Sequence, residues 1–146
     1  MASKIVPPAG MVGEAHELPH ALNPRGWPRP SGYANGVAAK GRLIVTAGVV
    51  GWDVMGNFPN DFVAQARQAF SNILLILAEG GAGPEHLVRL TWYVTDKREY
   101  MSRLAEVGQA YRRVIGRHFP TMTLVQVVAL VEDRAKVEIE ATAVVP

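Results

Sequence analysis

Apolar residues recur at helical spacing in two segments of the chain. Positions three or four apart gather on one face of a helix. In the first segment these positions are Phe62, Ala66, Ala69, Phe70, Ile73, Leu74 and Leu77. Asn60 or Asp61 provides an N-cap before this helix, and Gly80–Gly81 ends it. The second segment predicts a helix up to the stop at Phe119–Pro120, with apolar positions at Tyr100, Leu104, Val107, Tyr111 and Ile115.

Short runs rich in β-branched and aromatic residues predict the strands. The runs cover residues 42–48, 87–94, 123–130 and 136–145. In the last run Val137, Ile139, Ala141 and Ala143 point to one face, and Lys136, Glu138, Glu140 and Thr142 point to the other. The Lys40–Gly41 pair before the first run is typical of a hairpin turn, so we expect a further strand from residue 34 to 39.

This order of elements, β-β-α-β-α-β-β, predicts an α+β fold. Two helices can cover one face of a mostly antiparallel or mixed sheet. The second face then has no helix to cover it, and oligomerisation is the expected cover. Residues 1–31 contain six of the ten prolines, which predicts an extended N-terminal arm. Such an arm packs against its own domain or a neighbouring subunit, or forms a mobile tail. The domain itself is expected at residues 32–146.

Composition narrows the function classes. With 49% hydrophobic and 19% charged residues, the chain can bury a core. The formal net charge is only +2 and the charges are interspersed, so nucleic acid is an unlikely partner. The absence of cysteine excludes disulfides and thiolate metal sites and favours a reducing cytoplasm. No apolar run is long enough to span a membrane. The four histidines have no metal-ligand spacing, so we expect neither a metal nor a cofactor.

Four stretches together resemble the reactive-intermediate-deaminase (Rid, or YjgF) family. They are Ser31-Gly32-Tyr33, Val45-Thr46-Ala47-Gly48, the helical string at residues 65–73, and Phe119-Pro120 followed by the closing strand at 136–144. Their order and spacing match that family from about Gly32 to Val144. The resemblance implies a chorismate-mutase-like fold and a homotrimer whose sheets form a central barrel. It also implies small-molecule pockets in the clefts between subunits.

The same resemblance implies an activity and a set of site residues. Active members hydrolyse an enamine or imine to ammonia and a keto acid. An arginine two residues after the Phe-Pro pair clamps the substrate carboxylate, and this position is Met122 here. Glu138 is the expected catalytic residue, which places the attacking water. The expected substrate-binding residues are Tyr33, Ala47, Gly48, Trp92, Tyr93, Thr121, Met122, Thr123 and Leu124.

Met122 leaves several interpretations open. Met122 cannot make the bidentate contact of an arginine with a carboxylate, so the substrate is expected to be less anionic and more hydrophobic. Leu124, where many members have cysteine, makes the same pocket still more apolar. Alternatively hydrolysis has been lost and the chain is a non-catalytic small-molecule-binding or regulatory trimer. A ribonuclease or translation-inhibitor activity is a further alternative, which the weak charge surplus disfavours.

Two smaller questions concern single side chains. Arg42, Arg89 or Arg117 could supply the missing positive charge from another direction. Trp52, Trp92 and Tyr93 could form an aromatic wall for a ring-shaped ligand, or could serve only in packing.

Overall fold

A five-stranded mixed sheet forms the centre of the molecule in a computed structural model, which describes residues 17–146. The first half of the predicted arm, residues 1–16, lies outside the described residues. The strand order is β3 (Arg42–Val45), β7 (Val137–Val145), β5 (Leu87–Val94) and β6 (Thr121–Gln126), and the short β4 (Val49–Val50) also pairs with β7. β7 is antiparallel to β3, β4 and β5, whereas β5 and β6 run parallel. The predicted α+β fold with a mixed sheet is confirmed.

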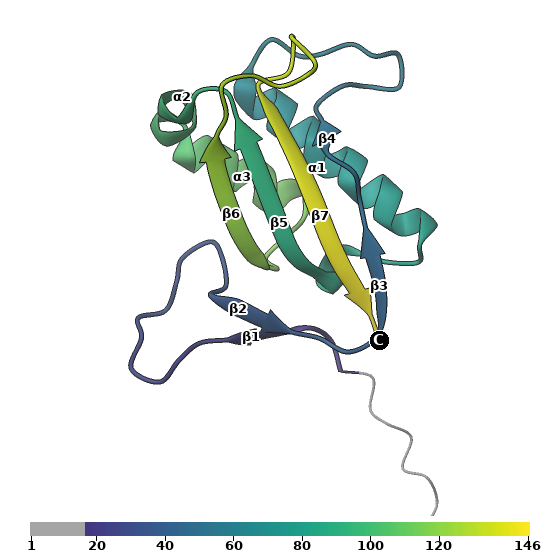
Figure 1. The fold of residues 1–146 in the computed structure, drawn as a ribbon, viewed down its shortest axis with the longest axis vertical. Helices are drawn as coiled ribbons and strands as arrows, with labels where there is room; N and C mark the ends of the chain where they lie inside the picture. The colour runs from purple at the N-terminus through teal and green to yellow at the C-terminus, as the bar shows by residue number, and fades with distance from the viewer. Residues whose placement is uncertain (1–16) are drawn as a thin grey trace, which may run out of the picture.

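Two helices cover one face of this sheet, as Figure 1 shows behind the strands. α1 (Phe62–Glu79) begins at Asp61, whose side chain accepts a hydrogen bond from the Ala64 N–H, and it ends at Gly80. α3 (Leu104–Val114) packs beside α1. A 3-10 turn (Pro84–His86) leads from α1 into β5. Of the helices within residues 17–146, none has the length and apolar character needed to cross a bilayer.

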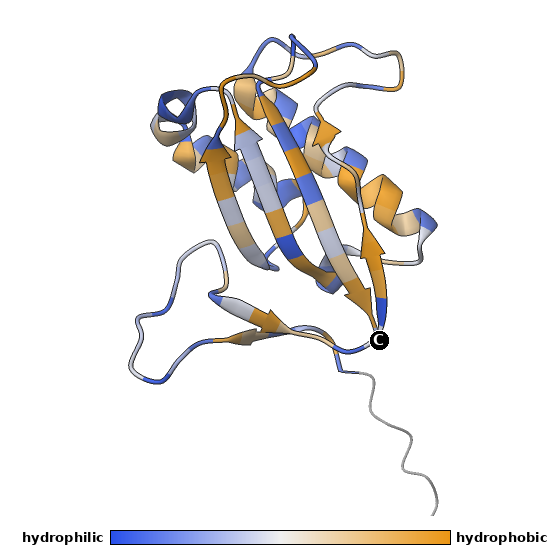
Figure 2. Cartoon of the chain, in the orientation of Figure 1, coloured by the Kyte–Doolittle hydropathy of each residue, from blue (hydrophilic) through white to orange (hydrophobic). Residues whose placement is uncertain are grey.

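The core lies between α1, α3 and the helix-facing side of the sheet. Phe62, Phe70, Ile73 and Leu77 of α1 are fully buried, as the helical spacing predicts. In β7 the residues predicted to face one way, Val137, Ile139, Ala141 and Ala143, are all buried. Figure 2 shows this alternation as changing colours along the β7 ribbon. The period-two pattern of the last strand therefore predicts correctly which side chains of β7 are buried against the helices.

The hairpin predicted at Lys40–Gly41 is wrong. β2 (Gly36–Ala38) pairs antiparallel with β1 (His20–Leu22), which lies inside the predicted arm, and not with β3. These two strands form a separate two-stranded sheet, drawn below the main sheet in Figure 1. Gly41 instead has a left-handed backbone (φ 147°) and packs so closely on the Val145 carbonyl that a side chain would overlap it.

Two predicted element boundaries also need correction. The second helix is divided into α2 (Lys97–Ser102) and α3 at Arg103, whose backbone leaves the helical region (φ −123°, ψ 22°). The guanidinium of Arg103 bridges Asp61 and Glu106, so a tertiary ion pair accompanies the break. β6 runs over 121–126 rather than 123–130, because its parallel partner β5 ends at Val94, which accepts the last hydrogen bond from Val127 N–H.

The other face of the sheet has no helix over it among residues 17–146. Leu43 and Val45 on β3 are 64% and 63% exposed, and Arg89, Thr123 and Glu140 are also exposed on this side. We call this surface the open face. Its mixture of apolar and polar side chains differs from the uniformly apolar helix-facing side.

We expect Phe70→Ala to destabilise the protein strongly. The ring is fully buried and packs edge-on against Trp92 and Tyr111, with centroids 5.2 and 5.5 Å away. Its removal is expected to lower the free energy of unfolding by about 3–5 kcal/mol. Urea unfolding followed by circular dichroism measures the change. Leu75→Ala on the same helix is the control, because Leu75 is 67% exposed and should change stability by less than about 1 kcal/mol. Equal losses in the two variants would contradict the assigned core.

Candidate functional site

Tyr33 is held against the edge of the sheet by its neighbour in the chain. The Ala34 N–H donates to the Pro120 carbonyl over 3.0 Å, and Ala34 forms an isolated parallel bridge with Thr121. Gly32 precedes them with a left-handed backbone (φ 78°), a conformation that favours glycine. The Ser31-Gly32-Tyr33 stretch therefore lies at the start of β6, although the two segments are far apart in sequence.

A pocket of about 620 Å³ lies beside this contact, between β6 and α3. Four of the expected site residues line it: Tyr33, Trp92, Met122 and Leu124. Tyr111 and Arg112 of α3 are among the residues that line its other wall. We call it the α3 pocket.

The register of the sheet explains why these side chains meet. Leu90 pairs with Met122 and Trp92 pairs with Leu124, so all four point to the helix-facing side. β6 is the edge strand on that side, and Met122 and Leu124 remain only partly buried. An apolar pocket is therefore left where the helix layer ends.

Trp92 forms the floor of the α3 pocket. Its ring is 4% exposed and makes edge contacts with Phe70 and Tyr100, with centroids 5.2 and 6.2 Å away. The Nε1–H is buried and has no hydrogen-bond partner within the described part of the chain. Such unsatisfied donors are costly and uncommon in protein interiors.

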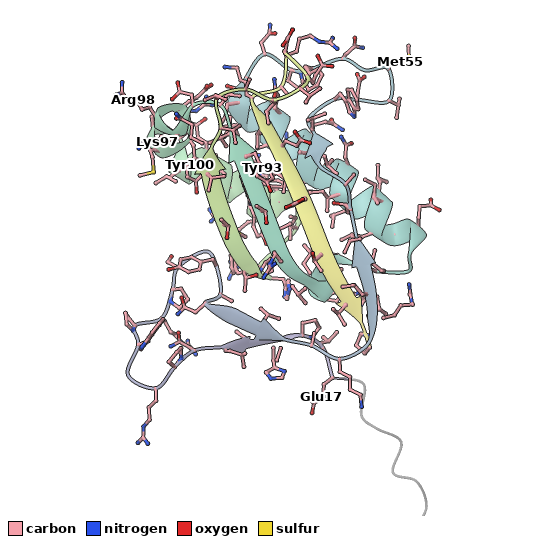
Figure 3. All side chains as sticks on the ribbon, in the orientation of Figure 1. Glu17, Met55, Tyr93, Lys97, Arg98 and Tyr100 are labelled. Atoms are coloured by element: carbon pink, nitrogen blue, oxygen red, sulfur yellow. The ribbon has the colours of Figure 1, made fainter. Side chains whose placement is uncertain are left out.

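A second cavity of about 910 Å³ lies on the open face, between this face and the β2 segment. Thr121, Thr123 and Tyr93 line it, together with Tyr33 and Met122, which also border the α3 pocket. The Tyr93 hydroxyl donates to Glu140 Oε1 over 2.9 Å, and this bond raises the pKa of Tyr93. Figure 3 shows Tyr93 over the middle of the sheet and Tyr100 at its margin.

Of the two alternatives for the aromatic residues, the structure supports packing and contradicts a shared aromatic wall within one chain. Trp92 and Tyr93 are neighbours on β5 and therefore point to opposite faces of the sheet. Trp52 lies in the loop after β4 and packs against Phe58, with centroids 5.8 Å apart. The three rings have no common pocket.

The remaining expected residues, Glu138, Ala47 and Gly48, lie together at another place. Glu138 is half-buried on β7, paired in register with Val50, and a side chain at Gly48 would overlap its carboxylate. Ala47 and Gly48 are exposed at the end of β3. None of the three lines the α3 pocket or the open-face cavity. Within one chain the expected site is thus divided among three places: the α3 pocket, the open-face cavity and the contact between Glu138 and Gly48.

The positive charge at the α3 pocket comes from a residue that the sequence analysis missed. Arg42 donates to the Gly80 carbonyl over 2.6 Å, Arg89 lines the open-face cavity, and Arg117 does not line the α3 pocket. Arg112 does line it. In the sequence, Arg112 stands out only by its position next to Tyr111 and one helical turn after Gly108. A single arginine in a helix has no distinctive pattern, so this position did not identify it.

Comparison with known proteins gives a consistent result. A model of the endoribonuclease L-PSP family matches residues 28–145. A RutC family protein of Haemophilus influenzae is 32% identical over 105 residues, which make up 71% of this chain and 80% of that protein. The 2-iminobutanoate/2-iminopropanoate deaminase of Escherichia coli K12 is 34% identical over 116 residues, 77% of this chain and 86% of the enzyme.

A solved structure agrees with these sequence matches. The protein YyfB of Yersinia pestis, described as a protein of unknown function of the conserved Rid family, superposes with a TM-score of 0.77 at 29% identity. The superposition covers 88% of this chain and all of that one. The likeness therefore extends over most of the described fold.

We expect Tyr111→Phe to weaken the pH dependence of stability in alkaline solution. Tyr111 is 4% exposed, its hydroxyl donates to the His118 carbonyl over 2.6 Å, and burial raises its pKa. Because the folded pKa lies above the unfolded value of about 10, the neutral phenol stabilises the fold below pH 10, and this contribution falls as the pH rises further.

Urea unfolding between pH 8 and 11 measures this effect. Wild type should lose stability more steeply above pH 10 than Tyr111→Phe. The exposed ring of Tyr33, 44% accessible, provides the control variant Tyr33→Phe, which should keep the wild-type slope. An unchanged slope in Tyr111→Phe would contradict the assigned burial of this phenol.

Proposed function

Because the chain belongs to the endoribonuclease L-PSP family, which includes the Rid proteins, we propose that it hydrolyses an imine or enamine. Water adds to the C=N carbon, the C–N bond breaks, and ammonia and a carbonyl compound are released. The observation that carries this proposal is the similarity over 116 residues to the 2-iminobutanoate/2-iminopropanoate deaminase. The α3 pocket, with Tyr33 at its edge, is the proposed substrate site.

Glu138 is the proposed catalytic residue, with the backbone at Ala47 and Gly48 beside it. Its carboxylate lies against the backbone of Gly48, so closely that a side chain at this position would overlap it. A half-buried carboxylate in this position is suited to accept a proton from water. Because Glu138 does not line the α3 pocket of its own chain, the proposal requires the Glu138 of a neighbouring copy.

A homotrimer provides this arrangement and is part of the proposal. Within the described part of the chain the open face has no helix over it, although the β2 segment borders the cavity on this face, and the β6 edge carries only the single bridge from Ala34. A neighbouring subunit on these surfaces would bury the exposed Leu43 and Val45. It would also close the α3 pocket from the side.

The proposed substrates are more apolar than 2-iminopropanoate. The family arginine is placed by resemblance at Met122, a thioether that cannot form two hydrogen bonds with a carboxylate. Leu124 and the Trp92 ring add apolar surface to the same pocket. An apolar substrate body gains more from these contacts than a small anion does.

The second candidate is a binding protein without catalysis. Met122 favours it, because a pocket that has lost the orienting cation can retain a ligand without positioning it for attack. A ligand that stabilises the protein and is recovered unchanged would support this candidate.

We expect Glu138→Gln to slow ammonia release by at least about 100-fold, since a positioned general base typically contributes that much. The imines of alanine and phenylalanine, generated by an amino-acid oxidase, serve as substrates, and ammonia formation above the spontaneous rate is measured. Glu140→Gln removes a charge two residues away on the same face of β7 and should leave the rate within about threefold. Equal release by wild type and Glu138→Gln from every substrate would reject hydrolysis at this site.

We also expect Met122→Arg to raise the rate with 2-iminopropanoate by about tenfold or more, because a bidentate guanidinium orients the carboxylate. Met122→Leu retains an apolar side chain of similar volume and should give no gain. The steady-state kcat/KM for both variants decides the question. No gain from the arginine would mean that Met122 does not occupy the carboxylate position.

A further inference from the structure

Arg112 is a cation at the mouth of the α3 pocket, and it has no counter-ion within the described part of the chain. Its side chain lines the pocket together with Met122. Between residues 17 and 146 no hydrogen bond or ion pair engages its guanidinium, and the side chain is exposed. By contrast, Arg103 pairs with Asp61 and Glu106, and Arg134 pairs with Glu132.

The guanidinium of Arg112 lies close to the backbone of Gly108. Gly108 precedes Arg112 by one helical turn on α3 and also lines the pocket. A Cβ at position 108 would be 3.2 Å from Arg112 Nη1 and 3.9 Å from Cζ and Nη2. The guanidinium therefore lies near the helix backbone at Gly108, where the absence of a Cβ leaves room for it, and it remains accessible to solvent.

The walls behind this cation are largely aromatic. Tyr111, Trp92 and Phe119 line the α3 pocket, and the rings of Tyr111 and Phe119 are stacked with centroids 5.4 Å apart. Arginine presents paired N–H donors that match the two oxygens of a carboxylate. The pocket therefore has a positive charge at its mouth and an apolar interior. A ligand that fits both has a negatively charged end and an apolar body.

Building on the proposed function, we propose that Arg112 binds the substrate carboxylate and that the substrate carries a bulky apolar group, which occupies the interior of the α3 pocket. In this arrangement the cation lies on α3 and not on β6, so the carboxylate binds at the mouth. A substrate as short as 2-iminopropanoate cannot then fill the pocket behind it. Arg112 is a specificity-determining residue in this arrangement.

Binding of stable product analogues to the full-length protein tests this proposal without measuring catalysis. Phenylpyruvate has both a carboxylate and an aromatic body, phenylacetone replaces the carboxylate with a methyl group, and pyruvate lacks the body. Isothermal titration calorimetry gives the dissociation constants. Wild type should bind phenylpyruvate at least about tenfold more tightly than either of the other two.

Arg112→Gln is expected to weaken phenylpyruvate binding by about tenfold and to leave phenylacetone binding unchanged. Arg113→Gln is the matched control, because it removes the same charge from the next residue of α3, which is also exposed but does not line the pocket. This control should bind all three compounds as wild type does.

Three results would overturn the proposal: wild-type affinity in Arg112→Gln, an equal loss in both arginine variants, or no binding of phenylpyruvate by wild type. Failure of the proposed hydrolysis gives a different pattern. In that case Arg112→Gln loses phenylpyruvate affinity while wild type releases no ammonia from the imine of phenylalanine. The site assigned to Arg112 would then stand, and its catalytic use would be rejected.

Discussion

The packing of Phe70 between Trp92 and Tyr111 is the interaction on which the rest of the structure depends. These three rings join α1, β5 and α3, so one buried contact sets the spacing of both helices above the sheet. Trp92 and Tyr111 both contact Phe70 and also line the α3 pocket. The shape of the candidate site is thus a direct consequence of how the core is packed.

The edge position of β6 explains why the pocket exists at all. A central strand would have both neighbours and a complete helix layer over it, whereas β6 has a full strand partner only in β5. The helix-facing residues Met122 and Leu124 are consequently covered in part and remain accessible. The single bridge from Ala34 then brings Tyr33 to the same edge. Residues from distant parts of the sequence meet here because the sheet ends here.

Local patterns predicted the elements whose partners are also local or fully buried. α1 follows from its apolar spacing and the Asp61 cap, and the boundaries of β5 agree with its run of β-branched and aromatic residues. The partner of β2 could not be predicted, because Lys40–Gly41 is equally compatible with a hairpin and with the turn actually formed. The break at Arg103 is accompanied by an ion pair with Asp61, 42 residues away, and no local pattern reveals this contact. Arg112 was missed for the same reason: its significance comes from Met122 and Tyr33, not from its neighbours on α3.

Where the cation lies decides how the pocket can recognise a ligand. A guanidinium on β6 would lie among apolar side chains in a partly buried position, where its hydrogen bonds would be stronger than in open solvent. Arg112 is exposed on α3, where solvent competes for the same donors and weakens each ion pair. The charge at the mouth can therefore select the orientation of a ligand, but it supplies only part of the affinity. Most of the binding energy has to come from apolar contact with rings such as Trp92 and Tyr111. A pocket built in this way discriminates mainly by the size and shape of the apolar group, and uses the carboxylate to set its direction.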